Sequence, residues 1–286
     1  MIQQILSGLE AGSWYAMLAV SIVIVMKATD VPNFAQAQIG MPGSYIAVNL
    51  IGKGWHAIPA MLIGLAVGYI IGAIIERIAI RPLSSLSHFP MLVMTIGLTY
   101  ALVSFVTITF GSEPRSFPAP WTEGGWFFGD LYVPYSQVIT ILLGIALALI
   151  LTYFFRTTWG VRMRAISENP GVARLLGINS GVVSSLAWGL GAAISTLAMM
   201  LHTQATLLAD SSADPLILKA FVASVLGSFT SLSGAFIGGL AIGILENLTG
   251  VWIGTGWKEA AALVVVVVYL FVRMPSLAKT IKPREV

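Results

Sequence analysis

The sequence contains no cysteine and few charged residues. Of its 286 residues, 9% are charged and 57% are hydrophobic, whereas soluble domains carry about 25% charged residues. The absence of cysteine excludes disulfides and thiolate metal sites, and the three histidines are too scattered to form a metal cluster. So much apolar surface must face lipid or other membrane helices. The composition therefore excludes a soluble enzyme, a nucleic-acid-binding protein and a disordered scaffold.

The chain also lacks a recognisable phosphate-binding loop. Such loops read Gly-x-x-x-x-Gly-Lys-Ser/Thr, because glycine lets the backbone N–H groups surround the phosphates. The nearest match, Gly52-Lys53, lacks both the upstream glycine and the following hydroxyl. Any nucleotide that drives this protein must therefore bind another subunit. The sequence supplies no candidate catalytic residue and no metal site.

Nine apolar segments divide the chain. They cover residues 5–26, 33–51, 57–80, 91–110, 134–155, 182–206, 215–229, 234–248 and 260–272. A spanning helix needs about 20 mainly apolar residues, and the seventh and eighth segments are short, while the second is polar at its start. We therefore predict an all-α, polytopic transmembrane helical bundle of eight or nine membrane segments in a single domain, residues 1–286. The second or the seventh segment is expected to be re-entrant or broken.

Lysine and arginine are distributed unequally between the two sides of this bundle. One side holds Lys27, Arg77, Arg81, Arg156, Arg162, Arg164, Arg174, Arg273, Lys279, Lys282 and Arg284. The other side holds Lys53, Arg115, Lys219 and Lys258. Because cytoplasmic loops carry the excess of positive charge, we predict that loop 156–181 and the C-terminus are cytoplasmic. The N-terminus, which reads as a retained span, and loop 111–133 are then external.

The external loop, residues 111–133, combines three prolines with several aromatic residues. Proline opposes a continuous helix, and aromatic side chains suit the interface between membrane and water. We expect either a loop that lies on the bilayer surface or a docking site for an external partner.

The cytoplasmic loop contains the pattern of a short capped helix. Asn169 before Pro170 is typical of a helix start, and Gly177 can adopt the left-handed conformation that ends a helix. The apolar residues between them lie at positions i, i+3 and i+4, on one face. This face packs either on its own bundle or on a cytoplasmic partner. The candidate contact residues are Glu168, Asn169, Pro170, Val172, Arg174, Leu175, Leu176 and Gly177.

Taken with this loop, several stretches resemble one family, the permeases of branched-chain amino acid ABC transporters. Residues 12–17 (Gly-Ser-Trp-Tyr-Ala-Met) resemble its first span, and residues 31–36 (Val-Pro-Asn-Phe-Ala-Gln) resemble its Asn-Phe-Ala-His-Gly-Glu segment. The end of the family's third helix resembles residues 75–82. Its C-terminal helical pair resembles residues 218–227 together with residues 234–239. The resemblance covers nearly the whole chain.

This resemblance implies a larger assembly in a bacterial or archaeal inner membrane. A second permease, identical or related, would complete the pore. Two ATPase subunits would bind ATP and Mg²⁺, and an external solute-binding protein would deliver the substrate. Transport would be inward, by alternating access, with the cytoplasmic loop as the contact with an ATPase subunit. No nucleic-acid partner is implied.

One departure from the family bears on the substrate. Where the family usually has His-Gly-Glu, this chain has Gln36-Ala37-Gln38, so two ionisable groups become neutral amides. The solute can therefore be amino acid-like, amide- or urea-like, or a carboxylate. We predict a pathway lined by Asn33, Gln36, Gln38, Lys219, Glu246 and Asn247. The alternative is that the amides only tie a broken backbone to neighbouring helices.

Charged groups in or near the spans are few, and a buried charge there is costly. We expect Glu76 to sit at the interface beside Arg77, Lys219 to extend toward the outer interface, and Asp214 to cap the helix that follows it. Glu246 can also reach the outer interface, because its segment is short.

Two rival classes of function remain from the residues alone. A secondary carrier or passive channel would transport without ATP. A membrane enzyme would need convergent acids, histidines or a metal site at one depth, and the histidines are dispersed. Repeated Gly-x-x-x-Gly spacings, as in Gly64, Gly68 and Gly72, indicate close helix packing within the subunit or against a second one.

Overall fold

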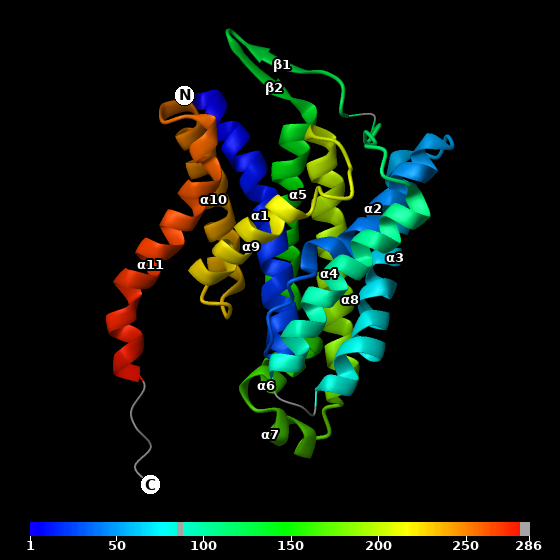
Figure 1. The fold of residues 1–286 in the computed structure, drawn as a ribbon, viewed down its shortest axis with the longest axis vertical. Coiled ribbons are helices and arrows are strands. Elements are labelled where there is room, and N and C mark those ends of the chain that lie inside the picture. The colour runs from blue at the N-terminus through cyan, green and yellow to red at the C-terminus, as the bar shows by residue number, and fades with distance from the viewer. Residues whose placement is uncertain (85–87, 120, 281–286) are drawn as a thin grey trace.

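The computed structural model describes residues 1–84, 88–119 and 121–280, and this part of the chain is almost entirely helical (Figure 1). The α-helices are α1 (Ile2–Thr29), α2 (Gln36–Gly52), α3 (Ala57–Ile75), α4 (His88–Phe110), α5 (Tyr135–Phe154), α6 (Thr158–Glu168), α7 (Pro170–Leu175), α8 (Ser180–Ala205), α9 (Asp214–Leu226), α10 (Leu232–Trp252) and α11 (Lys258–Thr280). A π-helical segment, Glu76–Ile80, and a 3-10 turn, Arg81–Leu83, continue α3, and a second 3-10 turn, Thr255–Trp257, precedes α11.

In the part of the chain that the structure describes, seven helices are long and apolar enough to cross a membrane. The two short membrane helices are α2, with 17 residues, and α9, with 13. These are the second and seventh predicted segments, so the polytopic helical bundle is confirmed. The eighth segment was predicted to be short, and this prediction is wrong. Helix α10 has 21 residues, because it extends beyond the predicted segment at both ends.

The two short helices begin inside the bundle rather than at its surface (Figure 1). Helix α1 runs from the end that carries the strands, here called the hairpin end, to the opposite end, here called the α7 end. The chain then returns to the middle, where α2 begins. Helix α8 runs the other way, and the chain again returns to the middle, where α9 begins. The two units therefore have opposite directions, the arrangement typical of transporters with inverted repeats.

Glycine allows the central helices to approach each other closely. A Cβ atom on Gly243 of α10 would lie 2.2 Å from the backbone nitrogen of Gly12 in α1. In α3, a Cβ atom on Gly68 would lie 2.1 Å from the Thr196 hydroxyl of α8. These glycine faces therefore pack within the subunit, the first of the two expected arrangements.

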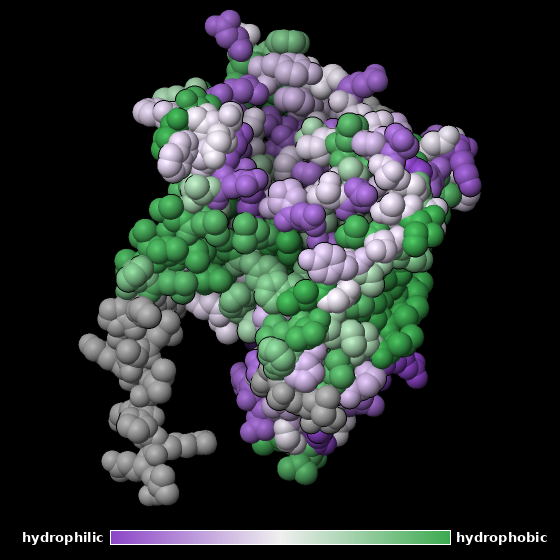
Figure 2. Space-filling model, in the orientation of Figure 1, coloured by the Kyte–Doolittle hydropathy of each residue, from purple (hydrophilic) through white to green (hydrophobic). Residues whose placement is uncertain are grey.

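The molecular surface matches a membrane setting. Figure 2 shows an apolar belt across the molecule, with polar surface at both ends. On the same face, polar surface also reaches from the hairpin end toward the middle, over the connection between α8 and α9. Ser211 and Asp214 are exposed there. This polar exposure at mid-depth is unfavourable against lipid, because hydrocarbon offers no hydrogen bonds.

The long loop of residues 111–133 leads into a hairpin that the sequence did not indicate. Strands β1 (Gly125–Phe128) and β2 (Leu131–Pro134) pair antiparallel, with Trp126 opposite Val133. The hairpin extends beyond the ends of the neighbouring helices (Figure 1), and Phe127 is 76% exposed. Its aromatic side chains are therefore available to an interface or a partner.

Candidate translocation and coupling sites

The short capped helix predicted in the basic loop is present as α7. The Asn169 side chain accepts a hydrogen bond from the Val172 backbone nitrogen at 3.0 Å, and Pro170 is the first helical residue. The helix ends at Leu175, and Gly177 follows with φ +79°. Capping at both ends stabilises a helix that is too short to be stable by itself.

The apolar face of α7 does not pack on its own bundle. Leu175 is 89% exposed, Leu176 is 73% exposed and Val172 is 50% exposed. The opposite face is anchored by Ala173, which is 2% exposed. The expectation that this face packs on its own bundle is therefore wrong, and the alternative, a contact with a cytoplasmic partner, stays a prediction. A row of exposed apolar side chains outside the membrane belt is typical of a contact surface.

A second helix, α6, precedes α7 and was missed by the sequence analysis. Met163 and Ile166 are buried and lie three residues apart, so one face of α6 packs on the bundle. Gly160 packs tightly on the preceding turn, since a Cβ atom there would lie 2.3 Å from the Phe155 Cα atom. The spacing of Trp159, Met163 and Ile166 was the signal that would have found this helix.

The charged residue Glu76 occupies a different environment from the predicted one. It is 1% exposed, and its partner is Arg81 rather than the adjacent Arg77. Arg81 Nη2 donates to Glu76 Oε2 at 2.7 Å, and Arg81 Nε donates to Glu76 Oε1 at 3.1 Å. The prediction of an interfacial Glu76 beside Arg77 is wrong, because a π-helical turn carries the chain from Glu76 to Arg81 and brings their side chains together.

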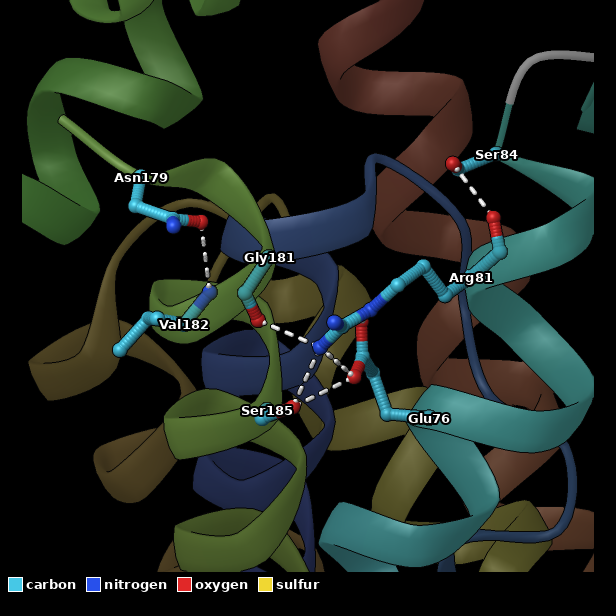
Figure 3. A network of polar contacts seen from close by, with 7 residues as sticks. All are labelled: Glu76, Arg81, Ser84, Asn179, Gly181, Val182 and Ser185. Atoms are coloured by element: carbon cyan, nitrogen blue, oxygen red, sulfur yellow. Dashed lines mark hydrogen bonds and ion pairs between the residues drawn. The ribbon is translucent and has the colours of Figure 1, made fainter. Parts of the chain in front are cut away.

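The same two side chains also reach the start of α8 (Figure 3). Arg81 Nη2 donates to the Gly181 carbonyl oxygen at 2.7 Å and to Ser185 Oγ at 2.6 Å. Ser185 Oγ donates to Glu76 Oε2 at 2.6 Å. The buried carboxylate is thus neutralised by one guanidinium and bound by one hydroxyl, as a buried charge requires.

At the beginning of α2, Asn33 and Gln36 form a fully buried amide network. Asn33 Nδ2 donates to Gln36 Oε1 at 2.8 Å, and Gln36 Nε2 donates to Ser195 Oγ of α8 at 2.9 Å. The Ser195 hydroxyl lies 3.1 Å from that of Ser21 in α1. This geometry supports the interpretation that these amides tie the broken backbone to its neighbours. Their role in a pathway stays a prediction.

Gln38 connects the beginnings of the two short helices. Its Nε2 donates to Asp214 Oδ1, the first residue of α9, at 3.1 Å. Its Oε1 is buried and has no hydrogen-bond partner among the described residues. Asp214 was predicted to cap α9, and this is wrong, since Ala213 occupies the N-cap position and no side chain caps the helix. Both helix N-termini therefore direct positive dipole ends toward the middle of the bundle.

Lys219 and Glu246 form a buried ion pair inside the bundle. Lys219 Nζ lies 2.6 Å from Glu246 Oε1, with side-chain exposures of 9% and 10%. The Tyr15 hydroxyl, halfway along α1, donates to Glu246 Oε2 at 2.8 Å and accepts from Lys219 at 3.2 Å. The expectation that either charge reaches the outer interface is wrong. Asn247 is separate, because its amide donates to Gly243 of its own helix at 3.1 Å.

The structure brings four of the six predicted pathway residues together in two pairs, Asn33 with Gln36 beside α8 and Lys219 with Glu246. Gln38 bonds to Asp214 of α9, and Asn247 bonds to its own helix. Sequence reasoning missed the partners Ser195 and Tyr15, since a serine or a tyrosine in a span gives no pattern of its own.

Comparison with known proteins identifies the family. Residues 4–273 match the family described as "Branched-chain amino acid transport system / permease component". The protein belongs to this family. One relative is the high-affinity branched-chain amino acid transport system permease protein LivH of Escherichia coli (strain K12). The two sequences are 30% identical over 295 residues, and the match covers 96% of this chain and 94% of that protein. This chain is also 30% identical over 288 residues to the corresponding permease protein BraD of Pseudomonas aeruginosa, covering 95% and 94%.

The resemblance of the sequence to branched-chain amino acid permeases is therefore confirmed over nearly the full chain. The fold is also similar to a solved structure, "PsaBC from Streptococcus pneumoniae in complex with Fab", with a TM-score of 0.50 and 13% identity over 93% of this chain and 90% of that one. The protein is accordingly a multi-pass membrane permease of the ABC transporter class.

Proposed function

We propose that this permease forms one half of the pore of an ABC importer. A second permease, identical or related, completes the pore, and an external solute-binding protein delivers a small organic solute. The solute is amino acid-like, amide- or urea-like, or a carboxylate. Two separate ATPase subunits bind ATP and Mg²⁺ and drive inward transport by alternating access. The family membership supports the class of protein, and the geometry of α7 supports the manner in which it is driven.

The observation that carries the proposal is the exposed apolar face of α7. The helix is capped by Asn169, anchored by Ala173 and presents Leu175 and Leu176 outward. Burying one leucine side chain contributes about 1.5–3 kcal/mol, so two leucines can supply much of a stable contact. An ATPase subunit is the partner that the family provides for such a surface.

The distribution of charge supports placing α7 in the cytoplasm. Arg156, Arg162, Arg164 and Arg174 lie in or beside α6 and α7. Positive charge favours the cytoplasmic side, so the α7 end faces the ATPases and the hairpin end faces the solute-binding protein. The tail residues Lys282 and Arg284, which entered the same prediction, lie outside the described residues.

The arrangement of α2 and α9 supports a pathway near the middle of the membrane. Their N-termini meet where Gln38 binds Asp214, and transporters place substrate sites at such junctions of broken helices. Asp214 is exposed at the start of α9, and polar surface reaches mid-depth over the connection that precedes α9 (Figure 2). A second permease that covers this face would enclose a polar pathway between the two subunits.

The proposal is tested by placing a charge in the α7 contact. Leu176→Asp removes the burial of one leucine, about 1.5–3 kcal/mol, which weakens ATPase binding roughly tenfold to a hundredfold. We expect loss of the ATPase on purification in mild detergent, or ATP hydrolysis that no longer responds to substrate. The matched control is Val161→Asp on α6, because Val161 is another exposed apolar residue, at 50% exposure. This variant should leave the complex intact.

The alternative, a secondary carrier or passive channel, makes the opposite prediction. If Leu175→Asp and Leu176→Asp both leave subunit association and ATP-dependent uptake unchanged, α7 is not the coupling contact. If no ATPase co-purifies with the wild-type chain and uptake proceeds without ATP, the carrier interpretation replaces the importer.

A further inference from the structure

We propose that Glu76, Arg81 and Ser185 form a transmission latch, which makes the segment between α3 and α4 follow the start of α8 when α7 moves. The inference rests on the proposed function, because it takes α7 as the driven element. It assigns a positioning role to three side chains that lie outside both the α7 contact and the predicted pathway. The latch is the network drawn in Figure 3.

The path from α7 to the latch is short. Helix α7 ends at Leu175 and α8 begins at Ser180. The connection is held by a hydrogen bond from the Ile178 backbone nitrogen to the Ala173 carbonyl oxygen at 3.0 Å, and Ala173 is buried. Gly181 and Ser185, which both accept from Arg81, lie within the first two turns of α8. A displacement of α7 therefore reaches the latch through the backbone.

Side-chain packing gives a less direct route. An open pocket of about 560 Å³ separates α7 from the latch, and its lining includes Pro170, Arg174, Glu76 and Arg81. The hydrogen bonds of the latch bridge the gap from the α8 side.

The segment that the latch holds, residues 76–83, differs from α3 in its packing and in its hydrogen bonding. Glycine packing fixes α3 to α8 as far as Gly72, where a Cβ atom would lie 2.5 Å from the Trp188 carbonyl oxygen. Beyond it the hydrogen bonding changes to a π-helix at Glu76–Ile80 and to a 3-10 turn at Arg81–Leu83. Such local changes of helix type often mark functional hinges.

Three hydrogen bonds of the latch join this segment to α8. Arg81 Nη2 donates to the Gly181 carbonyl oxygen and to Ser185 Oγ, and Ser185 Oγ donates to Glu76 Oε2. Helix α4, which follows the segment, buries Met91, Thr95, Leu102 and Val106 along one face, and the opposite face is largely exposed.

The experiment uses spin-label pairs in the purified complex with its ATPase subunits, since the chain has no native cysteine. Cysteines replace Arg77 in the π-helical segment, Val182 at the start of α8 and Thr152 in α5, which are all exposed. Distances 77–152 and 182–152 are measured without nucleotide and after trapping with ATP and vanadate. In the wild-type background both distances should shift together, by the about 1–5 Å typical of helix shifts.

Breaking the latch should separate the two movements. With Ser185→Ala or Arg81→Gln, the 182–152 distance should still shift on trapping, whereas the 77–152 distance should not. Ser185→Thr, which keeps the hydroxyl, should restore the joint shift. Ser184→Ala, one residue away, is the matched control and should behave as wild type. A role confined to holding the fold together would change both states equally.

The two proposals fail in different ways. If both distances shift equally in Ser185→Ala and in Arg81→Gln, the latch does not transmit the movement, although α7 can still be driven. If neither distance shifts in the wild-type background while the bound ATPases hydrolyse ATP, the driving of this chain through α7 is wrong. Retention of the ATPases and an unchanged elution volume establish that each variant is folded.

Discussion

Breaking the buried ion pair between Lys219 and Glu246 should lower the free energy of unfolding strongly. Replacing the whole pair with apolar side chains should change it little. Lys219→Met leaves the Glu246 carboxylate buried, with the Tyr15 hydroxyl as its one remaining partner among the described residues. The side chains are 9% and 10% exposed, so water cannot replace the lost ammonium. Removing one partner of such a pair costs about 3–5 kcal/mol. We therefore expect Lys219→Met to lower the free energy of unfolding by about that amount.

The replacement of all three groups should be nearly neutral. In the variant Lys219→Met, Glu246→Met and Tyr15→Phe, no buried charge or unpaired hydroxyl remains at this site. Apolar replacements of buried ion pairs are often neutral or stabilising. We expect the triple variant to recover most of the stability that Lys219→Met loses, so the effects of the single changes should be far from additive.

The measurement is equilibrium unfolding by sodium dodecyl sulfate in mixed micelles. Asn247→Leu provides the control, since Asn247 is a neighbouring, half-buried residue whose amide bonds only to its own helix. It should cost less than about 1.5 kcal/mol, the net value of one ordinary hydrogen bond. Two results would contradict the described ion pair. Lys219→Met would lower the free energy of unfolding no more than the control does, or the loss in the triple variant would equal the sum of the losses in the single variants.

Four further predictions concern the buried amides, the glycine packing and the orientation in the membrane. Gln36→Leu leaves buried hydrogen-bond partners unpaired and should lower stability by about 1–3 kcal/mol in thermal unfolding. Gln38→Leu should lower uptake or change substrate preference in vesicles while the complex assembles, and unchanged uptake kinetics would remove Gln38 from the pathway. Gly243→Ala places a methyl group against the α1 backbone and should cost about 1–3 kcal/mol, measured in mixed micelles. Single cysteines at Arg164 and Trp121 report orientation. An impermeant reagent in intact cells should label position 121, and labelling of position 164 instead would invert the topology.

The membrane segments could be predicted because their signal is local. Hydropathy alone located all nine, including the short α2 and α9, since length and composition decide whether a helix can span a bilayer. The ends of α7 were equally readable, because Asn169, Pro170 and Gly177 act within one turn of their own positions. The hairpin was missed, since the aromatic residues that build it also suit an unstructured interfacial loop.

The partners of the buried charges could not be predicted, because they are set by packing between distant segments. Lys219 meets Glu246 across 27 residues, and Gln38 meets Asp214 across 176. A single span shows a costly charge but not the group that neutralises it. For Glu76 the partner was close in sequence, yet an ordinary α-helix would not pair it with Arg81 five residues later. The π-helical turn makes that spacing possible.

The positions of these features indicate how one movement can act both at the start and at the middle of α8. The latch holds its first two turns through Gly181 and Ser185, and Ser195, further along the helix, holds the start of α2 through Gln36. A rigid tilt of α8 that begins at α7 would therefore move the segment after α3 and also displace α2 relative to α9. The contact most exposed to that displacement is the single hydrogen bond between Gln38 and Asp214. It joins the two half-length helices where a pathway would open. One hydrogen bond to a carboxylate contributes about 1.5–3 kcal/mol, so the movement of α8 has to overcome only this one bond to separate them.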